Sequence, residues 1–66
     1  MQVIINGEPH QVPAAISLAQ AVALLTSSQA GVAAALNGDV VRRAAWNTTS
    51  LADGDEVEVL TAVQGG

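Results

Sequence analysis

The chain has 66 residues, a formal net charge of −4 and a composition in which half of the residues are hydrophobic. This length predicts one small domain, and the absence of cysteine excludes a disulfide framework or a cysteine-ligated zinc site as its support. Six acidic residues against two arginines repel phosphate backbones, so nucleic acid is not an expected partner.

The first predicted elements are two strands joined by a tight turn. Residues 2–6 alternate in the manner of a half-buried strand. Asn6-Gly7 favours a type I′ turn, because both central residues of that turn have positive φ. We expect residues 8–12 to return antiparallel as an edge strand, since Pro9 has no N–H to donate to a neighbouring strand.

A helix is predicted next. Ser17 followed three residues later by Gln20 is the pattern of a capping box. Three apolar residues then recur at helical spacing: Leu18, Val22 and Leu25. We expect one amphipathic helix of about three turns that runs to Ser28 and lies across the sheet.

The middle of the chain predicts two further strands. Residues 32–36 form a short continuous apolar run, which is typical of a buried central strand. Asn37-Gly38 predicts a second turn, followed by a brief strand at Val40-Val41. Residues 42–50 look irregular, and we expect Leu51 to plug the core.

The last strand follows a turn at residues 53–55. Because alternate side chains of a strand point to opposite faces, we expect Val57 and Val59 to point inward and Glu58 and Leu60 to point outward.

The order strand–strand–helix–strand–strand–strand favours one arrangement, in which the first and last strands lie side by side and the helix covers one face. The fold class is therefore α+β, a β-grasp or ubiquitin-like domain with a mixed sheet of four to five strands covered by one main helix. We expect this domain to occupy residues 1–63, with residues 64–66 as a flexible tail.

No enzyme site or metal site is predicted. His10 stands alone on the expected edge strand, and the carboxylates of Asp53 and Asp55 lack the ligand spacing of a calcium loop. Ser17 has no partner base nearby. We therefore expect no catalytic residue, no metal and no bound cofactor.

The cellular location is predicted from what the sequence lacks. The chain begins without the positive residues of a secretory signal, and its apolar stretch from Ala14 to Leu25 is too short to span a bilayer. We therefore expect a cytoplasmic protein with no membrane partner.

Gly65-Gly66 at the C-terminal end is the feature with the clearest functional meaning. A backbone without side chains is slim enough to bring a terminal carboxylate into a narrow partner site. The three residues after Val63 would span about 10 Å when extended. The alternative is an ordinary frayed terminus.

Several segments together resemble the ThiS family of sulfur carrier proteins in thiamine biosynthesis. They are Ile5-Asn6-Gly7-Glu8, Val32 to Gly38, Val40-Val41, Arg43 to Trp46, Leu51 to Asp55 and Gly65-Gly66. Arg42 departs from the pattern, because family members often have proline there.

The resemblance implies that the chain is a carrier and not an enzyme. A ThiF-like enzyme would use Mg-ATP to adenylate the Gly66 carboxylate, and a cysteine desulfurase system would supply sulfur to form a thiocarboxylate. A ThiG-like thiazole synthase would then accept the sulfur. Gly65 and Gln64 would thread the tail into the partner, and Leu60 with Ile4 would form an apolar docking patch.

Two further residues remain open between partner recognition and packing: Arg43 and Trp46. Core packing is the default expectation for the tryptophan. Other functions also remain open, namely the small subunit of molybdopterin synthase, another sulfur carrier, a ubiquitin-like protein modifier and a plain binding module.

Overall fold

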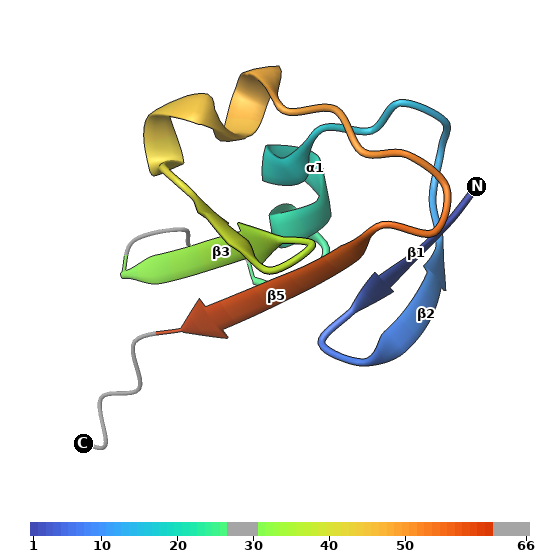
Figure 1. Cartoon of the computed structure of the whole chain (residues 1–66), viewed down its shortest axis with the longest axis horizontal. Coiled ribbons are helices and arrows are strands. Elements are labelled where there is room, and N and C mark those ends of the chain that lie inside the picture. Colours follow the sequence, from blue (N-terminus) through green and yellow to red (C-terminus); the bar gives the residue numbers. More distant parts are fainter. Residues whose placement is uncertain (27–30, 62–66) are drawn as a thin grey trace.

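The part of the chain that the structure describes forms a five-stranded mixed sheet with one α-helix against one face (Figure 1). The structure is a computed structural model, and it describes residues 1–26 and 31–61. The strands are β1 (Gln2–Ile5), β2 (Glu8–Gln11), β3 (Val32–Leu36), β4 (Asp39–Val41) and β5 (Glu56–Thr61). Their order across the sheet is β2-β1-β5-β3-β4, with β1 parallel to β5 and all other pairs antiparallel. The predicted α+β, β-grasp fold is confirmed.

The first hairpin forms as its sequence predicts. Asn6 and Gly7 have φ values of 51° and 83°, the positive values that a type I′ turn requires. The register pairs Ile5 with Glu8, and it places Pro9 on β2, at the edge of the sheet. Pro9 therefore lies where a missing N–H is tolerated.

The helix α1 (Leu18–Ala23) begins with the predicted capping box. The Ser17 hydroxyl accepts a hydrogen bond from the Gln20 backbone N–H at 3.1 Å, and the Gln20 side chain accepts one from the Ser17 N–H at 2.9 Å. These bonds satisfy backbone N–H groups that the first turn leaves without helical partners.

The predicted length of this helix is wrong, because α1 has six residues and ends at Ala23. The N–H groups of Leu24 and Leu25 bond three residues back, to Ala21 and Val22, so the last turn tightens. The Leu25 side chain is 42% exposed and does not continue the buried stripe. The predicted end at Ser28 lies outside the described residues.

The core lies between the sheet and α1. Its buried members are Val3, Ile5, Val12, Ile16, Leu18, Ala21, Val22, Ala34, Trp46, Leu51, Val57 and Val59. The inward positions of Val57 and Val59 and the plugging position of Leu51 are confirmed. No polar or charged side chain is buried among residues 1–26 and 31–61, so the small aliphatic residues and one indole stabilise this part of the domain.

The segment expected to be irregular contains a 3-10 helix, η1 (Arg43–Thr48). The Ala45 N–H bonds the Arg42 carbonyl at 2.8 Å, as the i→i+3 pattern of this helix requires. The sequence lacks a 3.6-residue pattern here, and Trp46 is the one residue of η1 whose side chain is buried.

Strand β3 is paired on both sides but is not the buried centre that its apolar run predicted. The centre of the sheet is β5, and within β3 only Ala34 is buried. The helix covers one face of the sheet, so the alternate residues of β3 face the open side. Within the described residues, no helix is long and apolar enough to cross a membrane.

Candidate functional site

Strand β5 leads directly to the C-terminal residues. It crosses the middle of the sheet and ends at Thr61, which pairs with Val32 of β3 (Figure 1). The predicted sulfur-carrying Gly66, the threading residues Gly65 and Gln64, and the predicted domain boundary after residue 63 all lie outside the described residues.

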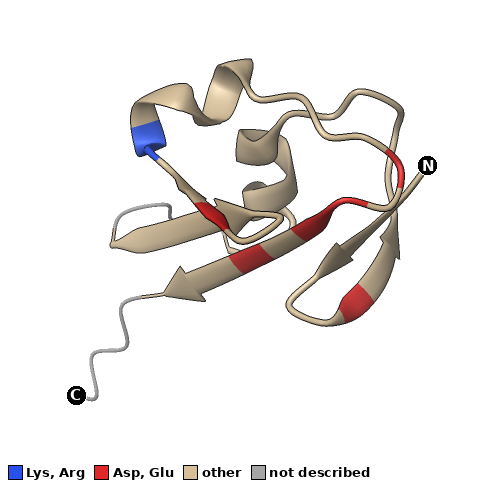
Figure 2. Ribbon diagram, viewed as in Figure 1, with Lys and Arg blue, Asp and Glu red and all other residues tan. Residues whose placement is uncertain are grey.

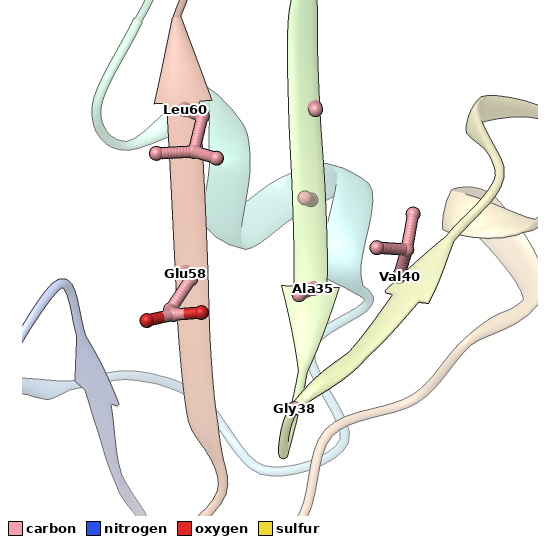
Figure 3. Close-up of a pocket in the computed structure, with 7 residues that line it drawn as sticks. Ala35, Gly38, Val40, Glu58 and Leu60 are labelled. Carbon is pink, nitrogen blue, oxygen red and sulfur yellow. The ribbon is translucent and has the colours of Figure 1, made fainter.

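An apolar groove lies on the open face of the sheet beside the last residues of β5. Its volume is about 160 Å³. It is lined by Ala33, Ala34, Ala35, Gly38, Val40, Glu58 and Leu60 (Figure 3). Among the large apolar side chains described, Val40 and Leu60 are the most exposed, at 79% and 69%.

The strand register explains the shape of this groove. Ala33 pairs with Leu60, and Ala35 pairs with Glu58 on one side and with Val40 on the other. The alanines carry only methyl groups, so β3 forms a low floor between taller side chains on β4 and β5 (Figure 3). The groove therefore combines an apolar floor with a single carboxylate, that of Glu58, at its side.

The structure does not bring Ile4 and Leu60 together as one docking patch. In the parallel pairing, Ile4 of β1 lies opposite Glu56, four residues before Leu60 on β5. At about 3.3 Å per residue, that offset is about 13 Å along the strand. Ile4 is half-buried, and Leu60 instead adjoins Ala33 and the groove.

Trp46 lies in the core. Its side chain is 2% exposed, and its indole N–H donates to the Val41 carbonyl at 2.8 Å. The Arg43 guanidinium lies over the indole, 5.2 Å from the ring centroid, in a cation–π contact. Packing therefore explains Trp46, whereas Arg43 combines this contact with an exposed position.

The charges are distributed unevenly over the domain (Figure 2). The arginines gather at the junction of β4 and η1, and the carboxylates lie on β2, β4 and β5 and in the loop before β5. Within residues 1–26 and 31–61, no three His, Cys, Asp or Glu residues are close enough to hold a metal ion.

Asn6 makes a contact with β5 that sequence reasoning missed. Its side-chain amide donates to the Val59 carbonyl at 3.2 Å and accepts from the Val59 N–H at 2.8 Å. The Asn-Gly turn already accounted for the asparagine, so no separate signal pointed to this contact. The groove was also missed, although alanines two apart in a strand, opposite an outward leucine, were a signal for it.

The sequence and the fold match a known family. The family model described as ThiS matches residues 3–66. The chain belongs to the ThiS family. The sulfur carrier protein ThiS of Escherichia coli (strain K12) is 30% identical over 66 residues, with both chains covered in full.

Solved structures support the same ThiS assignment. The crystal structure of the thiamine biosynthesis protein ThiS from Geobacter metallireducens is 35% identical, with a TM-score of 0.81 over the full length of both chains. A solution structure of a thiamine biosynthesis protein from the same organism is 36% identical, with a TM-score of 0.79, and matches all of this chain and 88% of that one. The predicted resemblance is confirmed, and with it the general role of a ThiS sulfur carrier protein.

Proposed function

We propose that the chain carries sulfur as a thiocarboxylate on Gly66 and delivers it for assembly of the thiazole of thiamine. The observation that carries this proposal is the family match, which extends through the final Gly65-Gly66. The position of β5 supports the proposal, because the strand that precedes Gly65-Gly66 in the sequence is the central strand of the sheet and is paired on both sides.

The carboxylate needs activation before sulfur can be attached. It is anionic and resonance-stabilised, so a nucleophile does not displace its oxygen. A ThiF-like enzyme, with Mg-ATP as its own co-substrate, would let a Gly66 oxygen attack the α-phosphorus, with pyrophosphate leaving. The terminal sulfur of a persulfide from a cysteine desulfurase system would then displace AMP. A thiol would cleave the remaining S–S bond and leave the thiocarboxylate on Gly66.

In the last step the thiocarboxylate sulfur attacks a carbonyl or imine carbon of the acceptor bound to a ThiG-like thiazole synthase. Water would then cleave the acyl–sulfur bond of this adduct, which leaves the sulfur on the acceptor and returns the Gly66 carboxylate. The chain is thus a protein substrate in each step, and its partners supply the catalytic groups. These reactions are expected in the cytoplasm.

The groove on the open face is the docking site for the ThiF-like enzyme in this proposal. It adjoins Leu60, next to the last residue of β5, so a partner seated there lies beside the end of the strand that leads to Gly66 in the sequence. Its volume of about 160 Å³ suits one apolar side chain. The Glu58 carboxylate suits a cation of the same partner segment.

The test is an intact-mass spectrum after incubation with Mg-ATP, a ThiF-like enzyme and a sulfur donor. The expected result is a mass gain equal to replacing one oxygen by sulfur. Deletion of Gly66 should remove the gain, whereas Glu8→Gln, far along the chain on the edge strand β2, should keep it.

Two outcomes would contradict the proposal. One is neither an adenylate nor a sulfur gain while an active control carrier reacts in the same mixture. The other is a covalent adduct of Gly66 with a lysine of another protein in place of the thiocarboxylate, which would indicate a protein modifier.

A further inference from the structure

Strand β5 is held differently on its two sides near the tail. On the β3 side, the pairing continues through Thr61, opposite Val32. On the β1 side, the last backbone bond runs from the Asn6 N–H to the Val57 carbonyl, at 2.9 Å. Beyond that bond, β1 turns away into its hairpin with β2.

The side chain of Asn6 replaces the missing strand. The backbone groups of Val59 face the β1 side, and the Asn6 amide bonds both of them: it accepts from the N–H at 2.8 Å and donates to the carbonyl at 3.2 Å. A primary amide has the donor and acceptor that a backbone peptide would have supplied. Among the described residues, this is the contact on the β1 side of β5 that is nearest to the tail.

Without this amide, the end of β5 would be held by β3 alone. Val59 itself is buried, so its unpaired N–H and carbonyl would either lose bonds or draw water into the edge of the core. Either change lets the last residues of β5 move away from the plane of the sheet. Strand β5 ends at Thr61, two residues after Val59, so we expect this movement to change the direction in which the chain leaves the sheet.

We propose that Asn6 is a positioning residue for the C-terminal tail, through its side-chain amide on Val59. The inference rests on the proposed function, because it assumes that Gly66 must reach a reacting centre in the partner. Misplacement of a reacting group by an ångström lowers rates by about 100-fold, so the direction in which the tail leaves matters.

The backbone of Asn6 allows a clean test. Its φ of 51° lies in the left-handed region, which glycine adopts without strain, so Asn6→Gly removes the amide and keeps the turn. Asn6→Asp keeps an acceptor for the Val59 N–H but loses the donor to the carbonyl. These two variants separate loss of the whole contact from loss of half of it.

Asn37→Gly is the matched control. Asn37 has the same φ of 51°, also precedes a glycine, and also bonds the backbone of β5 through its side chain. Its partner is the Glu56 N–H at the start of the strand, five residues before Thr61 and about 17 Å from it. The substitution is therefore the same in chemistry and differs in its distance from the tail.

The first measurement is the steady-state rate at which a ThiF-like enzyme adenylates the full chain. The rate is measured as the release of pyrophosphate. For Asn6→Gly we expect kcat to fall about tenfold with little change in KM, since the groove is untouched. The kcat of Asn6→Asp should lie between the kcat of Asn6→Gly and that of the unchanged chain. Asn37→Gly should stay within about twofold of the unchanged chain.

The second measurement is hydrogen exchange at the Val59 amide, which does not depend on any enzyme. We expect faster exchange in Asn6→Gly and unchanged exchange in Asn37→Gly, with all chains folded at the assay temperature. Equal losses of kcat in the two glycine variants, or no loss in either, would overturn the inference while the sulfur gain still upheld the proposed function.

The two hypotheses fail in distinguishable ways. If the unchanged chain gains no sulfur, the proposed function and the transfer role of Asn6 fall together. Unchanged exchange at Val59 in Asn6→Gly would overturn the inference directly, whatever the sulfur assay shows.

Discussion

The two Asn-Gly turns share a local structure and differ in what their asparagines hold. Asn6-Gly7 has φ values of 51° and 83°, and Asn37-Gly38 has 51° and 89°. Each asparagine side chain also reaches β5. The Asn6 amide bonds Val59 near the end of that strand, where the contact is partly buried.

The Asn37 amide serves the opposite end of β5. It accepts from the Glu56 N–H at 2.9 Å and donates to the Asp55 carboxylate at 3.1 Å, in an exposed setting. The same dipeptide thus forms the same turn twice. The two asparagine side chains differ in which end of β5 they bond. One turn orders the loop that enters the strand, and the other orders the end that leads to the tail.

The largest expected effect comes from a change in the core of the domain, which both turns adjoin only through their strands. Trp46→Ala removes a side chain that is 2% exposed and should lower the free energy of unfolding by about 3–5 kcal/mol. The free energy of unfolding of a domain of this size is roughly 3–10 kcal/mol, so a large fraction of the variant should be unfolded. Circular dichroism during urea denaturation measures this, because the substitution removes the single tryptophan.

The control for that experiment is Leu24→Ala, at a side chain that is 56% exposed. It should change the stability by less than about 1 kcal/mol. A loss below 1 kcal/mol for Trp46→Ala would contradict its assignment to the core.

Alanine at the two turn glycines tests whether the backbones are equivalent. An added Cβ would meet no atom within 4 Å at Gly7 or at Gly38, so only the positive φ opposes it. Gly7→Ala and Gly38→Ala should each lower the free energy of unfolding by about 1–2 kcal/mol. Thermal denaturation followed by calorimetry measures both, and losses that differ by more than 1 kcal/mol would break the equivalence.

A substitution in the groove tests whether the groove and the Asn6-Gly7 turn affect different steps, docking in one case and tail positioning in the other. Leu60→Glu places a second carboxylate two residues from Glu58 and removes an apolar wall, so docking should weaken. We expect the KM for the carrier in adenylation to rise about tenfold with kcat unchanged, the opposite pattern to Asn6→Gly. Leu24→Glu, away from the groove, should leave both constants unchanged, and the same result for Leu60→Glu would exclude the groove as the docking site.

The smallest expected effect is a difference between Asn37 and Asn6 in their coupling energy with Asp55, measured in the free energy of unfolding. Because Asn37 and Asp55 share a hydrogen bond, Asn37→Gly combined with Asp55→Ala should show a coupling energy of about 0.5–1 kcal/mol in unfolding. Asn6 contacts β5 four residues further along, so Asn6→Gly and Asp55→Ala should be additive within about 0.5 kcal/mol. Urea titrations of the single and double variants measure both, and equal coupling in the two pairs would contradict the separate roles.

Local sequence patterns predicted the elements whose structure depends on near neighbours. The Ser17–Gln20 capping box, both Asn-Gly turns and the inward positions of Val57 and Val59 could be read directly, because φ preference, capping and alternation act over a few residues. The predicted helix was too long, since spacing alone did not show that the Leu25 side chain remains 42% exposed.

The candidate site was predictable in part for the same reason. The outward position of Leu60 followed from alternation, but its neighbours did not, because they depend on which strands pair and in what register. The register separates Leu60 from Ile4 and places it beside Ala33, and burial in the core removes Trp46 from the surface.

The sequence by itself determined the family, the β-grasp order of elements and the C-terminal Gly65-Gly66 on which the proposed chemistry depends. The tertiary structure alone decided the alanine-floored groove, the core position of Trp46 and the contact of Asn6 with Val59. The physical reason is separation along the chain: Asn6 and Val59 are 53 residues apart, and only the parallel pairing of β1 with β5 brings them together.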